Sequence, residues 1–162
     1  MEEFITRDPM KPIMDFITTC PFLGAYHIDL TPTSTQKLVT SKPDGSSLDY
    51  DGSELIEDRR DMLGNRRCKR QATYQLFLLR NAGHNVQRKE IADFLFNLEQ
   101  WVEHQQAHGK CPKLSNNKQD QECETMRAGN GTYLQEWSDG TQANLYVVQL
   151  TIEYFNRYKE DN

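Results

Sequence analysis

The sequence predicts an α+β domain in which two helices pack on one face of a mostly antiparallel sheet. The chain has 162 residues, which is the size of one ordinary domain. Several segments alternate apolar and polar residues, as strands with one wet face do, and two others repeat apolar residues at helical spacing. The expected element order is helix, three strands, helix, two strands, and this order is typical of the fold class.

The N-terminal part is predicted to contain one helix followed by two strands. Apolar residues recur at helical spacing over residues 10–19, where Pro12 suits the first turn. Residues 25–30 alternate, which predicts a half-buried strand, and residues 36–41 are its expected partner. Residues 42–65 are dense in turn-forming residues and poor in apolar ones, so we predict a long exposed loop there.

The clearest periodicity belongs to the next strand and helix. Residues 66–80 alternate and predict a long strand with one side facing solvent. Asn85 can cap a helix that follows, and the single apolar stripe of this helix is expected to pack on the sheet. The stripe consists of Ile91, Phe94, Leu95, Leu98, Trp101 and Val102.

The last part of the chain is predicted to hold a surface excursion and two strands. Residues 110–130 are polar and irregular, which is typical of an exposed segment. Residues 132–137 indicate a short strand, and residues 143–158 alternate over a long closing strand. Residues 1–162 are together expected to form a single domain.

Composition and charge exclude several classes of function. The formal net charge is −5, from 19 basic and 24 acidic side chains, so the molecule as a whole does not favour a nucleic-acid backbone. No apolar run approaches the roughly 20 residues that span a bilayer, and we expect no membrane partner. The N-terminal residues lack the basic and apolar stretches of a secretory signal, so synthesis is expected in the cytoplasm, with four free cysteine thiols.

The common catalytic and cofactor motifs are absent from the sequence, so we predict neither an enzyme nor a cofactor. One pattern leaves a zinc site open. His104 and His108 are one helical turn apart near a predicted helix end, and Cys111 and Cys123 follow, so four suitable ligands could gather. The favoured alternative is that the histidines complement the helix dipole and the cysteines are incidental.

A second pattern partly matches a calcium-binding loop. Ser47, Asp49, Asp51, Gly52 and Asp58 occupy its first, third, fifth, sixth and twelfth positions. The match is incomplete, because Ser replaces the first Asp and Asp replaces the bidentate Glu. We favour a solvated acidic turn, and no metal is expected.

The strongest local charge lies in residues 59–70, where six cations fall within twelve residues of an acidic chain. These candidate partner-binding residues are Arg59, Arg60, Arg66, Arg67, Lys69 and Arg70. They form either a solvated strand end or a contact for an acidic protein surface. Sequence-specific nucleic-acid binding is not expected, because no aromatic residues alternate with the cations. Asp49 and Asp51 are candidates for the complementary acidic surface on another subunit.

Three segments together resemble a known family. They are the strand ending Tyr74–Arg80, the helix Arg88–Trp101 and the closing strand Tyr146–Tyr158. In pattern and order they look like the minor capsid, or tail-terminator, proteins of tailed bacteriophages of Gram-positive hosts. The resemblance covers about residues 10–158 and contains no short diagnostic motif.

The resemblance implies a non-enzymatic virion protein at the head–tail junction, made in the host cytoplasm. Such a protein forms a homo-oligomeric ring, usually a hexamer, that caps the tail tube, stops its polymerisation and joins the tail to the head connector. Its partners would be further copies of itself, the tail tube protein and the connector protein. Two alternatives stay open: a head–tail connector or tail completion protein of the same fold, and a small nuclease-like enzyme using His27, Asp29 and the acidic loop.

Overall fold

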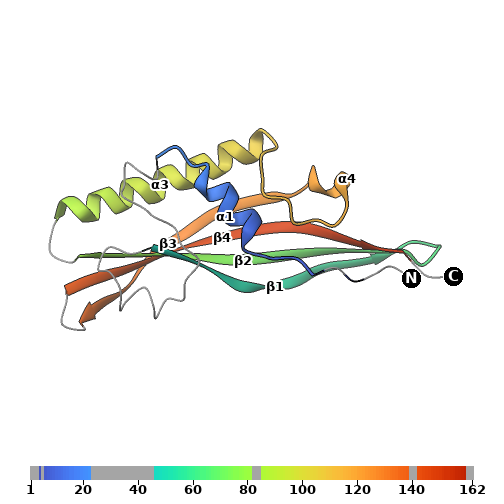
Figure 1. Cartoon of the computed structure of the whole chain (residues 1–162), viewed down its shortest axis with the longest axis horizontal. Helices are drawn as coiled ribbons and strands as arrows, with labels where there is room; N and C mark the ends of the chain where they lie inside the picture. The colour runs from blue at the N-terminus through green and yellow to red at the C-terminus, as the bar shows by residue number, and fades with distance from the viewer. Residues whose placement is uncertain (1–3, 5, 23–45, 82–84, 139–141, 160–162) are drawn as a thin grey trace.

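The fold is a four-stranded antiparallel sheet with helices packed on it, which confirms the α+β class. A computed structural model of the chain describes residues 4, 6–22, 46–81, 85–138 and 142–159. Figure 1 shows α1 (Lys11–Thr18) and α3 (Asn85–Ala107) on the same side of the sheet.

The sheet is built from two hairpins. Its strands are β1 (Ser46–Arg60), β2 (Arg66–Asn81), β3 (Thr125–Ser138) and β4 (Gln142–Tyr158). They lie in the order β1-β2-β4-β3, so β2 and β4 are central and β1 and β3 are the edges. The central pair is antiparallel and continuous over the full length of β2, whereas β1 has two register shifts against β2.

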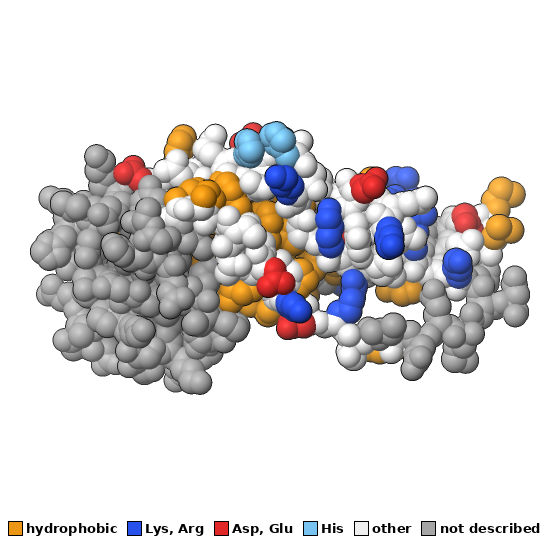
Figure 2. All heavy atoms as spheres, turned by 45° about the horizontal axis from the view of Figure 1, so that its top comes forward, with side chains coloured by type: hydrophobic (Ala, Val, Ile, Leu, Met, Phe, Trp, Pro, Cys, Tyr) orange, Lys and Arg blue, Asp and Glu red, His pale blue; other side chains and the backbone are white. Residues whose placement is uncertain are grey.

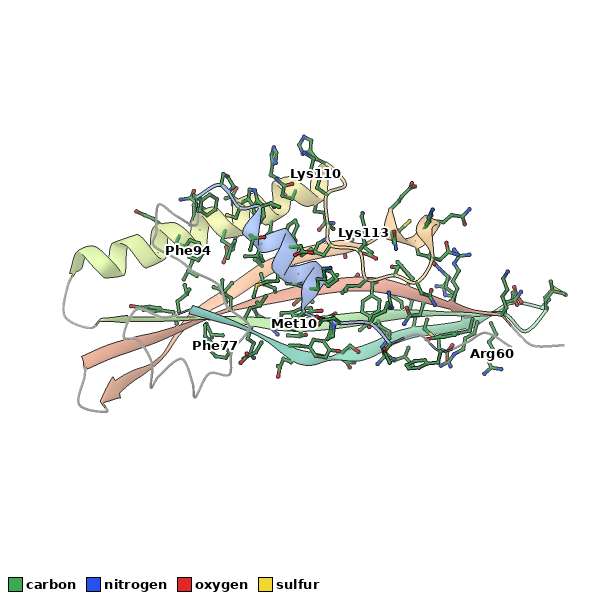
Figure 3. All side chains as sticks on the ribbon, viewed as in Figure 1. Met10, Arg60, Phe77, Phe94, Lys110 and Lys113 are labelled. Atoms are coloured by element: carbon green, nitrogen blue, oxygen red, sulfur yellow. The ribbon has the colours of Figure 1, made fainter. Side chains whose placement is uncertain are left out.

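The core lies between the sheet and the two helices. The even-numbered side chains over residues 72–78 of β2 and 146–154 of β4 face α1 and α3 because side chains alternate along a strand. Ile13, Phe16 and Ile17 of α1 pack there, and the rings of Phe16 and Trp101 are 4.8 Å apart. Figure 3 shows Phe94 on the helical side of the sheet and Phe77 on the other.

The predicted helix stripe is confirmed where the structure describes its side chains. Phe94, Leu98 and Val102 are buried, and Leu95 and Trp101 pack against the same core. The side chain of Ile91 lies outside the described part of the chain. The predicted helix over residues 10–19 and the strands over 66–80 and 143–158 are also confirmed, as α1, β2 and β4.

The prediction of a loop over residues 42–65 is wrong for most of its length, because residues 46–60 form β1. An edge strand needs few apolar residues, since hydrogen bonds to β2 hold its backbone and much of its side-chain surface faces water. Gly52, with a φ of 95°, lies between the paired residues Tyr50 and Ser53 where the register shifts. Of the described residues in this range, only 61–65 form a connecting turn, and residues 42–45 lie outside the described part of the chain.

The prediction of an exposed excursion over residues 110–130 is also wrong in large part. Cys111, Leu114 and Ser115 are buried, a short helix α4 (Lys118–Gln121) follows, and β3 begins at Thr125. Long-range hydrogen bonds satisfy the polar groups of this segment. They join Ser115 and Asn116 to the end of β4, and Leu114 and Ser115 to the buried carboxylate of Glu124.

The remaining predictions for the fold divide in two. The two strands expected at residues 25–30 and 36–41 lie outside the described residues. Among the described residues, two strands, β1 and β2, precede α3, whereas we expected three. The strand expected at residues 132–137 is confirmed within β3, which starts earlier in the chain than predicted.

Candidate functional site

The turn between β1 and β2 forms a projecting tip. Figure 1 places it at one end of the long axis of the molecule, beyond α4. Met62 is fully exposed and Leu63 is 78% exposed, and Figure 2 shows hydrophobic side chains at the surface of this end. Apolar side chains presented in this way beside charged ones suit contact with another protein.

The turn is ordered by its own side chains. The Asp61 carboxylate accepts hydrogen bonds from the backbone N–H groups of Leu63 and Asn65, both at 2.9 Å, and from the Asn65 side chain at 3.0 Å. Gly64 has a φ of 86°, a conformation that favours glycine. The apolar residues are therefore presented by a defined turn, which lowers the entropic cost of a contact.

Four of the predicted cations lie at the base of this turn. Arg59 is opposite Arg67, and Arg60 is opposite Arg66, in the antiparallel register of β1 and β2. Like charges directly opposite each other on paired strands repel. The arrangement therefore needs nearby carboxylates.

Asp58 and Glu57 offset the positive charge of two of these arginines, Arg66 and Arg59. Asp58 accepts two hydrogen bonds of 2.8 Å from the Arg66 guanidinium, which lowers the pKa of the carboxyl below its ordinary value. Glu57 lies 3.6 Å from Arg59, and both of these side chains are well exposed. This second pair is accordingly weak.

Asp120 of α4 compensates the charge of Arg67 and also that of Arg157 on β4. Its carboxylate is buried and accepts from Arg67 at 3.0 Å and from Arg157 at 2.6 and 3.0 Å. The hydrogen bond from Arg157 is the main reason why the pKa of Asp120 is lowered. Asn117 caps α4 by accepting from the backbone N–H of Gln119, which fixes where Asp120 points.

The structure separates the six predicted cations into two groups. Lys69 pairs with Glu153 at 3.3 Å, and the Arg70 guanidinium donates to the Ser53 hydroxyl at 3.2 Å. These contacts lie within the body of the sheet. The tip group therefore contains only four of the six.

Asp49 and Asp51 lie in the middle of β1, apart from the tip. Asp49 is opposite Gln75 in the register, and Asp51 accepts a 3.3 Å hydrogen bond from the Gln75 side chain. Because residues 46–60 are extended, they form neither a calcium-binding loop nor the acidic turn that we favoured, and both expectations for this segment are wrong.

The zinc pattern does not converge either. The rings of His104 and His108 stack 4.3 Å apart at the exposed end of α3, whereas Cys111 is buried and Cys123 is exposed elsewhere. Within the described ranges, no three His, Cys, Asp or Glu side chains could share a metal ion.

A cleft of about 470 Å³ lies beside the tip. Arg157 and Lys159 of the chain's C-terminal part line it together with the four tip arginines, and Asn116, Asn117, Asp61, Asn65 and Tyr158 complete the wall. Sequence reasoning missed Arg157, Lys159 and Asn116, because they are far from residues 59–67 in the chain. The only available signal was that an antiparallel closing strand can place its end beside the start of the long central strand.

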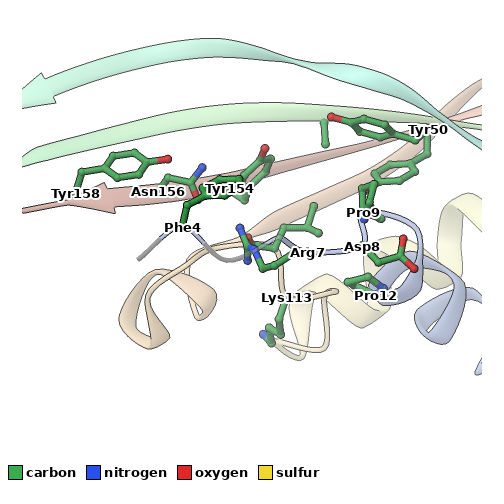
Figure 4. Close-up of a pocket in the computed structure, with 13 residues that line it drawn as sticks. Phe4, Arg7, Asp8, Pro9, Pro12, Tyr50, Lys113, Tyr154, Asn156 and Tyr158 are labelled. Carbon is green, nitrogen blue, oxygen red and sulfur yellow. Dashed lines mark hydrogen bonds between the residues drawn. The ribbon is translucent and has the colours of Figure 1, made fainter. Parts of the chain in front are cut away.

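A second pocket, of about 310 Å³, lies on the helical side of the sheet. Figure 4 shows the N-terminal segment, with Phe4, Arg7 and Pro9, crossing the end of β4, with Tyr154 and Asn156. The Tyr74 hydroxyl donates to the carbonyl of Pro9 at 2.7 Å, and burial raises the pKa of this phenol.

The described residues that line this second pocket do not include a pair of carboxylates. Asp8 is the only carboxylate among its lining residues, so two carboxylates do not converge there. His27 and Asp29, which the enzyme alternative requires, lie outside the described residues.

No protein-family model matches this chain, and no curated protein matches its sequence. Among the described residues, no helix is both long and apolar enough to cross a membrane.

Proposed function

We propose that the chain is a structural virion subunit of the tail-terminator kind. In this proposal copies of the chain form a ring that caps the tail tube, stops its polymerisation and joins the tail to the head connector. The observation that carries the proposal is the β1–β2 hairpin. Its turn exposes Met62 and Leu63, and four arginines, Arg59, Arg60, Arg66 and Arg67, lie at the base of that turn.

The hairpin has the properties of a contact arm. Its turn is ordered by Asp61, and its base is tied to α4 through the Arg67–Asp120 ion pair. A rigid projection loses little conformational entropy when it binds, so a small apolar tip with charged neighbours can form a specific contact.

A ring requires a heterologous contact, in which two different surfaces of each subunit meet. The basic tip is one such surface. The acidic stretch of β1, with Asp49, Asp51 and Glu54, is a candidate for the other, because its strand is at the edge of the sheet where a neighbour can approach.

The test is whether assembly depends on the tip. Light scattering after size exclusion, together with negative-stain microscopy, is applied to the wild-type chain and to the Met62→Gln/Leu63→Gln double variant. We expect rings for the wild type and loss of rings for the variant, with unchanged melting temperature because both side chains are exposed.

The matched control is Phe96→Gln, since Phe96 is a large exposed apolar residue on α3, away from the tip. We expect this variant to form rings. A wild-type chain that stays monomeric at all concentrations, also in the presence of tubes of its own tail tube protein, contradicts the proposal, as does a double variant that assembles normally.

A further inference from the structure

We infer that the cleft beside the β1–β2 turn binds an acidic polypeptide segment, one that carries closely spaced carboxylates. This inference deepens the proposed function, on which it rests, because it names the chemistry that the contact arm recognises. The cleft is the tip cleft described above, lined by Arg59, Arg60, Arg66, Arg67, Arg157 and Lys159.

Among the described residues, positive charge exceeds negative charge around this cleft. Six of these residues that line it are cations, and one is a carboxylate, that of Asp61, which already accepts three hydrogen bonds within the turn. Behind the wall, Asp58 and Asp120 neutralise part of the charge of Arg66, Arg67 and Arg157. Within the described residues, no carboxylate lies within ion-pair distance of Arg60 or Lys159.

Arg67 is held at the wall of the cleft by two contacts. Its Nη2 donates to Asp120, whereas its buried Nε–H finds no acceptor in the part of the chain that the structure describes. The guanidinium is held in place by stacking on the Phe155 ring, 3.9 Å from the ring centre. The side chain lines the cleft and is 38% exposed, so it presents its charge to a ligand there, whereas the buried Nε–H is out of the ligand's reach.

The arginines are positioned before any ligand arrives. Asp120 and Asp58 fix three guanidinium groups by short hydrogen bonds, and Asn116 holds the backbone of Arg157 through a 2.8 Å hydrogen bond from its N–H. Guanidinium groups in fixed positions match carboxylates in two-point contacts, because both groups are planar and forked.

The surroundings of the cleft favour a polypeptide over a nucleic acid. Met62 and Leu63 adjoin the cations and can pack on apolar side chains of an acidic segment. Among the described residues of the wall, only Tyr158 is aromatic, whereas single-stranded nucleic acids are bound by stacking on successive aromatic rings. The net charge of −5 also opposes a long polyanion.

The experiment measures fluorescence anisotropy of a labelled oligoglutamate peptide titrated with the full chain. An oligoglutamine peptide of the same length and a single-stranded DNA oligonucleotide are the comparison probes. We expect binding of the oligoglutamate that weakens with salt, no binding of the oligoglutamine and weaker binding of the DNA.

The deciding variant is Arg60→Gln/Lys159→Gln, because these two cations have no ion pair to lose among the described residues. We expect about tenfold weaker peptide binding, the sum of two solvent-exposed charge contacts, with unchanged melting temperature. The control is Lys110→Gln/Arg127→Gln, which removes the same charge from exposed positions elsewhere; Figure 3 shows Lys110 at the end of α3, apart from Arg60. This control should bind the peptide as the wild type does.

Three results overturn the inference: no binding of oligoglutamate, tighter binding of DNA than of peptide, or equal loss of binding in both double variants. Ring assembly is measured separately, without peptide. If the chain forms rings but does not bind the peptide, the inferred role of the cleft is wrong and the proposed function stands. If the chain binds the peptide but never forms rings, the proposed function is wrong and the inferred role of the cleft stands.

Discussion

The buried carboxylate of Asp120 accepts a 2.6 Å hydrogen bond from Nε of Arg157. Asp120 belongs to the short helix α4 and Arg157 to the end of β4, and Arg67 of β2 donates to the same carboxylate. One side chain thus joins three elements at the base of the projecting turn. Both arginines also line the tip cleft, so the stability of this region and the shape of the candidate site depend on the same carboxylate.

Asp120→Asn is expected to lower the free energy of unfolding by about 1.5 to 3 kcal/mol, because charge-assisted hydrogen bonds from two partly exposed arginines are weakened. Urea unfolding followed by circular dichroism measures the change. Asp93→Asn, at an exposed position of α3, is the control and should change stability by less than about 0.5 kcal/mol. Equal effects of the two variants would mean that the Asp120 contacts contribute no stability.

Asp120 should also make the stability of the wild type fall as the pH is lowered into the acid range. Because Arg157 and Arg67 lower its pKa in the folded state, the folded chain binds fewer protons than the unfolded one. Its stabilisation is therefore present above the ordinary aspartate pKa of about 3.9 and is lost as the pH falls through the folded pKa. The free energy of unfolding, measured below about pH 4, should decline less steeply in Asp120→Asn than in the wild type. Parallel declines would contradict this.

Glu124 should have the opposite pH dependence. Burial raises its pKa, although hydrogen bonds from Ser115 and Leu114 oppose this shift. A carboxyl whose pKa is higher in the folded than in the unfolded chain contributes its full stabilisation of the fold at pH values below the ordinary glutamate pKa of about 4.3. That contribution is lost as the pH rises through the folded pKa. The stability of the wild type relative to Glu124→Gln should therefore be greater near pH 4 than near pH 7. A difference that does not change with pH would show that this carboxyl titrates normally.

Leu98→Ala is expected to cost about 2 to 5 kcal/mol of unfolding free energy, because Leu98 is fully buried between α3 and the sheet. Phe96→Ala on the same helix is the control, since Phe96 is 62% exposed and its truncation opens no cavity. Chemical denaturation of the two variants measures the unfolding free energy of each. A loss below about 1 kcal/mol for Leu98→Ala would contradict the burial of the stripe.

Metal removal is expected to leave the chain unchanged. His104 and His108 stack on each other at the end of α3, and Cys111 is buried away from them, so no shared ligand set exists within the described residues. Purified protein should contain no stoichiometric zinc or calcium, and a chelator should not shift its melting temperature. Elemental analysis that finds one tightly bound metal ion per chain would overturn this prediction.

The candidate site could be predicted only in part. Arg59, Arg60, Arg66 and Arg67 stand out in the sequence because they are close together in the chain. Arg157 and Lys159 do not, because the pairing of β2 with β4 brings them to the same place from a distant part of the chain. The same pairing explains why Lys69 is not in the tip group: Glu153 of β4, which lies diagonally across the strand pair from it, forms an ion pair with it.

The sequence by itself determined the elements whose own periodicity is strong. These are α1, β2, α3 and β4, where one apolar face repeats often enough to specify both the element and the side that it buries. Tertiary structure alone decided β1 and residues 110–124. The polar residues of β1 become a strand because β2 offers backbone partners along its length, and the polar segment after α3 becomes buried because Asp120 and Glu124 find donors on distant residues. The local spacing of apolar residues indicates which face of an element is buried. A hydrogen-bond partner that is distant in the chain does not affect this spacing, so the sequence does not predict it.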